Sequence, residues 1–143
     1  MSKPLEILID SDAFVGRFYP DDVHYQQATR IFAQLEQAGK QIVSTNLVIM
    51  ETATVLSHRS GQVLARKFLA VLDKTRLPII HINEKLHQES LSFFKKQDKK
   101  GTSLVDCANV VVMRRFAITS IFSFDKFYAR QPGIQMPQKA GLL

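Results

Sequence analysis

Short apolar runs alternate along this chain with longer stretches in which apolar residues recur every three or four positions. The short runs predict strands that are buried on both faces, at residues 5–9, 41–45, 78–82 and 118–124. Between the first two runs, Ala28, Ile31 and Leu35 share one side of a predicted helix, and Gly39 is placed to end it. The chain therefore begins as a strand, a helix and a second strand.

Capping residues mark where the later helices begin and end. Thr45 or Asn46 is placed to cap a helix after the second strand, and Gly61 separates that helix from another one. Asn83 is placed to cap a helix after the third strand, and Ser103 begins the helix before the last strand. Strands that alternate with helices predict an α/β fold with a mostly parallel sheet, because the crossovers between parallel neighbours cover both faces.

Length and composition fit one domain over residues 1–143. The chain has 143 residues and a mass of 16.2 kDa, with 45% hydrophobic and 22% charged residues, which is typical of a globular domain. There is no internal repeat and no low-complexity linker. The segment from about residue 132 to residue 143 contains Gly and Pro at several positions and is expected to be a loop-like tail.

The cysteine content and the charge bear on the cellular compartment and on the class of binding partner. A lone cysteine, Cys107, cannot form an intrachain disulfide, and neither a secretory signal nor an apolar run long enough to span a membrane is present, so a cytoplasmic protein without membrane contact is expected. The net charge of +6 and the pI near 9.6 favour a phosphate-rich partner such as nucleic acid. Many small proteins are basic for solubility alone, so charge by itself does not decide the matter.

Four carboxylates occupy positions from which they can meet at one edge of the predicted sheet. Asp10 ends the first strand and Asp125 ends the last one, while Glu51 and Asp106 lie in the first turns of helices. The usable site of an open parallel sheet lies beyond the carboxyl ends of its strands. Four acids gathered there repel one another unless a cation lies between them, and oxygen ligands favour Mg²⁺ or Mn²⁺ over Zn²⁺.

Each of these acids also has a purely structural interpretation. Asp106 fits a capping box with Ser103, Asp125 is placed to cap a turn, and Glu51 can be a solvated helix residue. Asp10 is harder to explain in that way, because a charge at the end of a buried strand is costly unless it is paired. Asp12 is expected to sit in a turn rather than to bind metal.

The ordered set of motifs resembles one known family. Asp10 with Ser11, then Glu51, then residues 102–108 (TSLVDCA) and finally residues 123–127 (SFDKF) resemble the motifs of PIN-domain nucleases. The resemblance is closest to the small VapC-type toxins of VapBC toxin–antitoxin modules, and it extends from the first strand to the last motif. It implies a three-layer fold with helices on both faces of the central sheet.

The resemblance also implies a function, a metal site and partners. The four acids would be the catalytic and metal-binding residues, and the activity would be Mg²⁺- or Mn²⁺-dependent hydrolysis of RNA, inhibited by a small antitoxin protein. The chemistry fits, because a divalent cation held by carboxylates activates water without a protein nucleophile. We expect Asp10 and Asp106 to be direct ligands, Glu51 to be a ligand or to position the attacking water, and Asp125 to be an outer or second-metal ligand.

Candidate surfaces for the partners are less sharply marked. The residues expected to contact RNA are Ser11, Lys99, Lys100, Arg114 and Lys126, although such basic side chains are more often solvated charges on a helix face. A homodimer is expected, with the apolar helical face around Leu64, Phe68 and Leu72 as its interface.

Two other functions remain open on the sequence. The first is a catalytically silent PIN-like module that only binds RNA or a partner. The second is a phosphatase of the haloacid-dehalogenase type, which Asp10 and Asp12 after an apolar strand resemble, although Ala13 and Phe14 follow where that family's motif differs. The four histidines form no zinc motif, and no glycine-rich phosphate loop is present.

Overall fold

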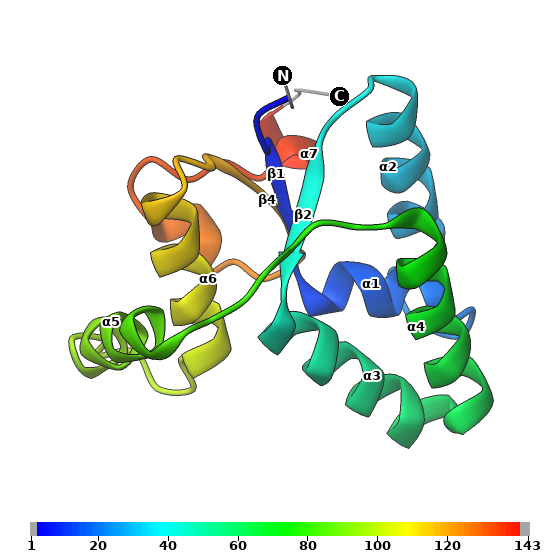
Figure 1. The fold of residues 1–143 in the computed structure, drawn as a ribbon, viewed down its shortest axis with the longest axis horizontal. Coiled ribbons are helices and arrows are strands. Elements are labelled where there is room, and N and C mark those ends of the chain that lie inside the picture. The colour runs from blue at the N-terminus through cyan, green and yellow to red at the C-terminus, as the bar shows by residue number, and fades with distance from the viewer. Residues whose placement is uncertain (1–2, 141–143) are drawn as a thin grey trace.

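A four-stranded parallel sheet forms the centre of the protein in the computed structural model, which describes residues 3–140 (Figure 1). The strands are β1 (Ile7–Ile9), β2 (Ile42–Thr45), β3 (Ile79–Ile80) and β4 (Ser120–Phe122), in the order β3-β2-β1-β4. Ile7 lies opposite Ile42 on one side and Ser120 on the other. The predicted α/β fold is confirmed, with strands shorter than the apolar runs that predicted them.

The helices follow the predicted order, with α1, η1 and α7 in addition. They are α1 (Ser11–Phe18), α2 (Tyr25–Gln37), α3 (Asn46–Ser60), α4 (Gln62–Thr75), α5 (Glu84–Lys95), α6 (Leu104–Arg115), the 3-10 turn η1 (Tyr128–Arg130) and α7 (Pro137–Ala140). Thr45 and Asn83 cap α3 and α5 by accepting backbone N–H bonds, as expected. The sequence predicted one helix between the first two strands, whereas the structure has two, α1 and α2.

Helix α1 was missed because it starts without a connecting turn and is only eight residues long. The side chain of Asp10 accepts a hydrogen bond from the backbone N–H of Ser11, so the last strand position also serves as the helix cap. Gly16 lets α1 cross close to α2, because a Cβ at this position would lie 3.0 Å from the Cβ of Ala28.

The alternation of side chains along β1 divides the interior into two layers. Ile7 and Ile9 point into a cluster formed with α1, α2, α3 and α4, whereas Leu8 points into a second cluster with α6 and β4. In Figure 1, α1 to α4 lie on one side of the sheet, and α5 and α6 lie on the other. This is the predicted three-layer arrangement.

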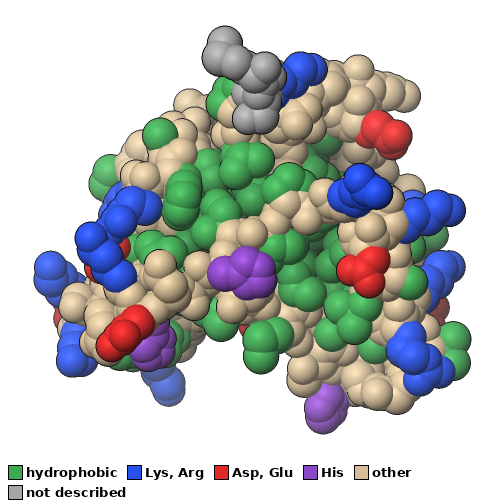
Figure 2. Space-filling view, viewed as in Figure 1, with side chains coloured by type: hydrophobic (Ala, Val, Ile, Leu, Met, Phe, Trp, Pro, Cys, Tyr) green, Lys and Arg blue, Asp and Glu red, His purple; other side chains and the backbone are tan. Residues whose placement is uncertain are grey.

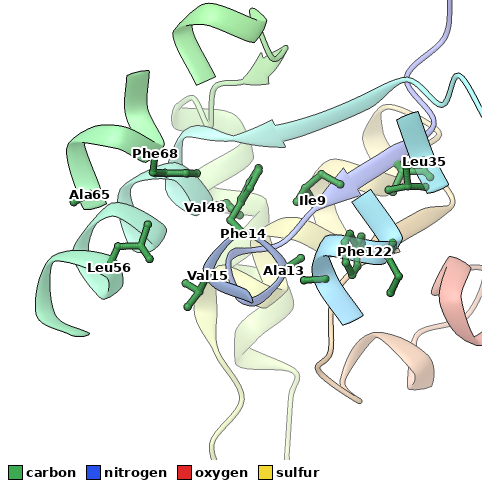
Figure 3. Packing of buried hydrophobic residues seen from close by; sticks show 13 residues of the cluster. Ile9, Ala13, Phe14, Val15, Leu35, Val48, Leu56, Ala65, Phe68 and Phe122 are labelled. Carbon is green, nitrogen blue, oxygen red and sulfur yellow. The ribbon is translucent and has the colours of Figure 1, made fainter. Parts of the chain in front are cut away.

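The larger cluster depends on aromatic contacts between α1 and α4. The rings of Phe14 and Phe68 pack edge to face with their centroids 5.3 Å apart (Figure 3). Phe68 is completely buried, and Leu64 and Leu72 pack against the same cluster. Phe68 is therefore not available for the expected dimer face, because it fills the protein's own core. Leu64 and Leu72 are half-buried against that core, and the homodimer itself stays a prediction.

The end of the chain is more ordered than its composition suggested. Gln135 pairs in parallel with Ser120, its N–H donates to the carbonyl of Thr119, and its carbonyl accepts from the N–H of Ile121. Met136 is buried, and α7 follows it. Within residues 132–140, this single bridge and α7 are thus the regular structure in a segment that was expected to be a loop-like tail, and the last three residues lie outside the described range.

Within residues 3–140, no helix is both long and apolar enough to cross a membrane.

Candidate active site

Asp10 occupies the centre of the site, at the carboxyl end of β1. Its side chain is almost completely buried, with 3% of the residue exposed. One carboxylate oxygen accepts from the backbone N–H of Ser11 at 2.8 Å and from the amide Nδ2 of Asn109 at 3.2 Å. The other oxygen accepts from the hydroxyl of Ser123 at 2.9 Å. These donors from α1, α6 and the end of β4 fix the orientation of the carboxylate.

Asp106 is brought to the same place by the start of α6. The hydroxyl of Ser103 accepts from the backbone N–H of Asp106 at 3.3 Å, which is the expected cap. The carboxylate of Asp106 faces the site, where its Oδ1 accepts from the hydroxyl of Tyr128 at 2.8 Å. The backbone N–H of Asp106 therefore takes part in the helix cap, and its carboxylate takes part in the site.

Asp125 and Glu51 complete the group of acids from two further elements. Asp125 is exposed in the turn after β4, where its Oδ1 accepts from the N–H of Phe127, and its charge helps to raise the pKa of Asp106. Glu51 is half-buried on α3, and its charge contributes to raising the pKa of Asp10. The structure thus places all four sequence-predicted acids at one edge of the sheet.

A fifth carboxylate, Asp12, belongs to the same cluster. It lies in the first turn of α1 and not in the turn that was expected, because the helix begins directly after Asp10. Its Oδ2 accepts from the N–H of Phe124 at 3.0 Å and from the Ser123 hydroxyl at 3.2 Å. Its Oδ1 is buried and has no hydrogen-bond partner among residues 3–140. Asp12 therefore ties α1 to the end of β4 and leaves one oxygen available.

Sequence reasoning missed three polar residues of the site, namely Ser123, Asn109 and Tyr128. Ser123 follows β4 as Asp10 follows β1, so its position was a usable signal. Asn109 lies three residues after Asp106, on the same side of α6, and this spacing was also readable. Nothing in the sequence pattern distinguished Tyr128 from the core aromatics. Its ring is itself a core aromatic, because it is completely buried.

Burial and mutual repulsion raise the pKa values of three carboxyl groups. Burial is the main cause for each, raising the pKa of Asp10 to about 6, that of Asp12 to about 7 and that of Asp106 to about 8. The charge of Asp10 is the second cause for Asp12 and for Asp106. Within residues 3–140, none of the three carboxylates forms a salt bridge. Their negative charges lack a protein counter-ion in this range.

The donor set fits a hard divalent cation. Its ligating atoms are carboxylate oxygens, the ligands that Mg²⁺ and Mn²⁺ prefer. The unpartnered Oδ1 of Asp12 and the uncompensated charge of Asp10 and Asp106 are the features that a bound cation would satisfy. No three His, Cys, Asp or Glu side chains of the described residues already stand at metal-binding geometry. A cation would therefore have to draw the carboxylates together.

The residues expected to contact RNA are divided between two places. Lys99 and Lys100 are exposed in the turn before α6, and Lys126 is exposed next to Asp125. Ser11 is half-buried beside Asp10, to which its backbone N–H donates. Arg114, however, lies at the far end of α6 from Asp106, about 12 Å along the helix axis.

The guanidinium of Arg114 already has contacts within the protein. It lies 5.6 Å from the centre of the Phe93 ring and donates to the carbonyl of Pro132 at 3.3 Å. These contacts give Arg114 a role in joining α6 to α5 and to the segment after η1. Of the predicted set, Lys99, Lys100 and Lys126 have exposed side chains nearest in sequence to the acids.

Comparison with known proteins identifies the family of this arrangement. The sequence pattern of the PIN domain matches residues 7–133. The chain belongs to the PIN-domain family. A relative, the 23S rRNA-specific endonuclease VapC20 of Mycobacterium tuberculosis, is 24% identical over 119 residues, which are 83% of this chain and 88% of the relative.

Solved structures of other proteins share the fold. The crystal structure of Mycobacterium tuberculosis VapC20, described as a sarcin-ricin loop cleaving toxin, has a TM-score of 0.78 and 23% identity, covering 87% of this chain and 93% of that one. A toxin–antitoxin complex from Klebsiella pneumoniae has a TM-score of 0.64 and 16% identity, covering 92% and 98%. The resemblance to the PIN family that the motifs indicated is confirmed.

The raised pKa values predict that this PIN domain loses stability as pH rises when no divalent cation is present. A carboxyl group whose pKa is higher in the folded state than in the unfolded state holds its proton more tightly when folded, so stability is present at low pH and is lost as pH rises. For Asp106, the window runs from the ordinary value of 3.8 to about 8. We expect the Tm measured in EDTA to fall from about pH 5 to about pH 8, and Mg²⁺ to restore it.

Asp106→Asn separates this effect from other titrations, because an amide does not ionise. The Tm of the variant should fall less over the same window than that of the wild type, whereas Asp21→Asn, a change at an exposed residue, should leave the wild-type slope unchanged. If Tm fell equally with pH in the wild type and in Asp106→Asn, a raised pKa of Asp106 in the carboxylate cluster would be contradicted.

Proposed function

We propose that this protein is a metal-dependent endoribonuclease and the toxin of a toxin–antitoxin module. The observation that carries the proposal is the set of buried carboxylates around Asp10, which lacks a protein counter-ion within the described residues and sits in a PIN domain. The relative from Mycobacterium tuberculosis is named an endonuclease for 23S rRNA, and the Klebsiella protein is part of a toxin–antitoxin complex. Both names support the activity and the biological role.

The four predicted acids have distinct proposed roles in hydrolysis. A divalent cation in this site supplies a nucleophilic water near neutral pH and stabilises the developing charge on the phosphate. Asp10 and Asp106 would hold the cation directly. Glu51, on a different element, would be a further ligand or orient the attacking water, and Asp125 in its exposed turn would be an outer or second-metal ligand.

Exposed lysines near the acids support RNA as the substrate. Lys99 and Lys100 precede the helix that carries Asp106, and Lys126 follows Asp125 directly. They add positive charge beside a site that is itself strongly negative, which allows phosphates to be held on either side of the scissile bond. The surplus of +6 over the whole chain is consistent with this use.

Asp10→Asn should abolish RNA cleavage while the protein remains folded. Loss of a direct ligand removes several kcal/mol of charge stabilisation, so we expect at least about a 100-fold lower rate on a structured RNA at saturating Mg²⁺. Asp21→Asn is the matched control and should cleave normally. Cleavage by the wild type should also stop in EDTA.

The alternative of a catalytically silent PIN module predicts a different outcome from the same assay. Wild-type protein would then bind RNA without cleaving it at any Mg²⁺ or Mn²⁺ concentration. Cleavage that survives both EDTA and Asp10→Asn would show that another site, or a contaminating nuclease, is responsible.

An apolar groove supports the proposed antitoxin partner. A cavity of about 620 Å³ lies between α1, α2 and α4, with Phe14, Phe18 and Phe32 in its lining. Figure 2 shows hydrophobic side chains gathered on this side of the molecule, with charged groups at the margin. The hydroxyl of Thr29, also in the lining, is buried and has no hydrogen-bond partner in the described part of the chain.

The groove and the acidic site are joined by α1, and this suggests how one partner would reach both. The helix starts at the acids, and its Phe14 and Phe18 lie in the groove. We propose that the antitoxin lays an apolar segment in the groove, with acidic residues facing Lys67 at its margin, and places a basic side chain among the carboxylates. Such a side chain would compete with the cation.

Expression of the protein alone should arrest bacterial growth, and co-expression of its antitoxin should relieve the arrest. Lys67→Glu should weaken relief, because it reverses a charge beside the groove, whereas Lys85→Glu on α5 should not. Growth curves with each pair of plasmids provide the measurement. Harmless expression of folded wild type at high yield would exclude the toxin role but leave the nuclease activity open.

A further inference from the structure

We propose that Tyr128 is a positioning residue that, together with Asn109, sets the geometry of Asp10 and Asp106 for cation binding. The proposal rests on the proposed metal-dependent function of the site. Tyr128 and Asn109 stand behind the carboxylates, so they act through Asp10 and Asp106 and do not contact the substrate.

A continuous hydrogen-bonded chain connects the two carboxylates. The Tyr128 hydroxyl donates to Oδ1 of Asp106 at 2.8 Å, and the same hydroxyl accepts from Nδ2 of Asn109 at 3.0 Å. That amide nitrogen also donates to Oδ1 of Asp10 at 3.2 Å. Tyr128 and Asn109 are both completely buried, so water does not compete for these bonds.

The chain can run in only one direction. An amide NH₂ group has two hydrogens, and here one points to Asp10 and the other to Tyr128. Because the phenol oxygen already accepts from Asn109, its single hydrogen is directed at Asp106. Both carboxylates are therefore held as acceptors, which is the state that binds a cation.

The bond from Tyr128 also orients the Asp106 carboxylate. It takes one acceptor position of Oδ1, and Oδ2 makes no bond to Tyr128. The amide and the phenol together orient the two carboxylates. This arrangement lowers the cost of assembling the ligand set when the cation binds.

Packing explains the ring of Tyr128 but not its hydroxyl. The ring fills the core cluster beneath α6 and contacts Phe127 edge to face, with centroids 5.3 Å apart. A phenylalanine would fill the same space without burying a polar atom, and a buried hydroxyl is costly unless its bonds are satisfied. The hydroxyl is thus the part of the residue that the carboxylates require.

Tyr128→Phe tests the proposal, with Tyr19→Phe as the matched control because Tyr19 lies on the opposite end of α1 from the acids. Mn²⁺ affinity is measured directly by electron paramagnetic resonance of the free ion, without RNA. Loss of a residue that orients metal ligands typically costs 10- to 100-fold, so we expect Mn²⁺ to bind at least about 10-fold more weakly to Tyr128→Phe and normally to the control.

Cleavage kinetics provide a second readout that a purely structural role would not change. At low Mn²⁺, kcat of Tyr128→Phe should fall while KM for RNA stays constant, and high Mn²⁺ should restore kcat. Circular dichroism and Tm establish that the variant is folded. Unchanged Mn²⁺ affinity in folded Tyr128→Phe would overturn the proposal.

Asn109→Leu is the second variant, because it removes the amide while filling a similar volume. It should weaken Mn²⁺ binding in the same direction, and if Tyr128→Phe does not fold, this variant decides. If neither variant folds, Tyr128 and Asn109 are required for folding, and the proposed positioning role is wrong. Failure of the wild type itself to bind Mn²⁺ or to cleave RNA would contradict the proposed function instead, so the two failures are distinguishable.

Discussion

The burial of one negative charge, on Asp10 at the end of β1, is the constraint on which the site depends. β1 lies between β2 and β4, so whatever follows it is surrounded by helices from both layers. A carboxylate in that position is tolerated only with hydrogen-bond donors around it. The chain supplies them from residues 11, 109 and 123, and this requirement fixes how α1, α6 and β4 meet.

The same constraint gives the site its capacity for function. Donors to Asp10 compensate for part of its lost hydration, but they bring Asp12 and Asp106 close to it, and the pKa values of all three groups rise. Because the buried carboxylates repel one another, any positive charge that enters the site stabilises the folded protein. A divalent cation and a partner's basic side chain are two ways to supply it, so catalysis and inhibition would use one electrostatic feature.

The sequence predicted those parts of the site that depend on local position. Asp10 and Asp125 end predicted strands and Asp106 starts a predicted helix, and parallel strands bring such positions to one edge. It did not predict α1, since Asp10 acts at once as strand end and helix cap. The place of Ser123 after a predicted strand was readable, but its bond to Asp10 joins residues 113 positions apart, and the spacing does not say which two strand ends meet.

The surface predictions failed where a residue type has two common uses. Phe68 has the spacing of a helix face, but spacing does not say whether that face meets a partner or the protein's own core, and here it meets Phe14. Arg114 has the charge for RNA, yet its guanidinium packs on Phe93 and reaches a backbone carbonyl. In both cases tertiary packing determines what the side chain contacts, and the local sequence pattern does not indicate that packing.

The most direct test of the account is a crystal structure determined with Mn²⁺, using anomalous scattering to locate the ion. We expect a strong anomalous peak from an ion bonded to carboxylate oxygens of Asp10 and Asp106, with the Tyr128 hydroxyl still donating to Asp106. A well-ordered site with no peak at saturating Mn²⁺, or a peak that contacts neither Asp10 nor Asp106, would contradict it.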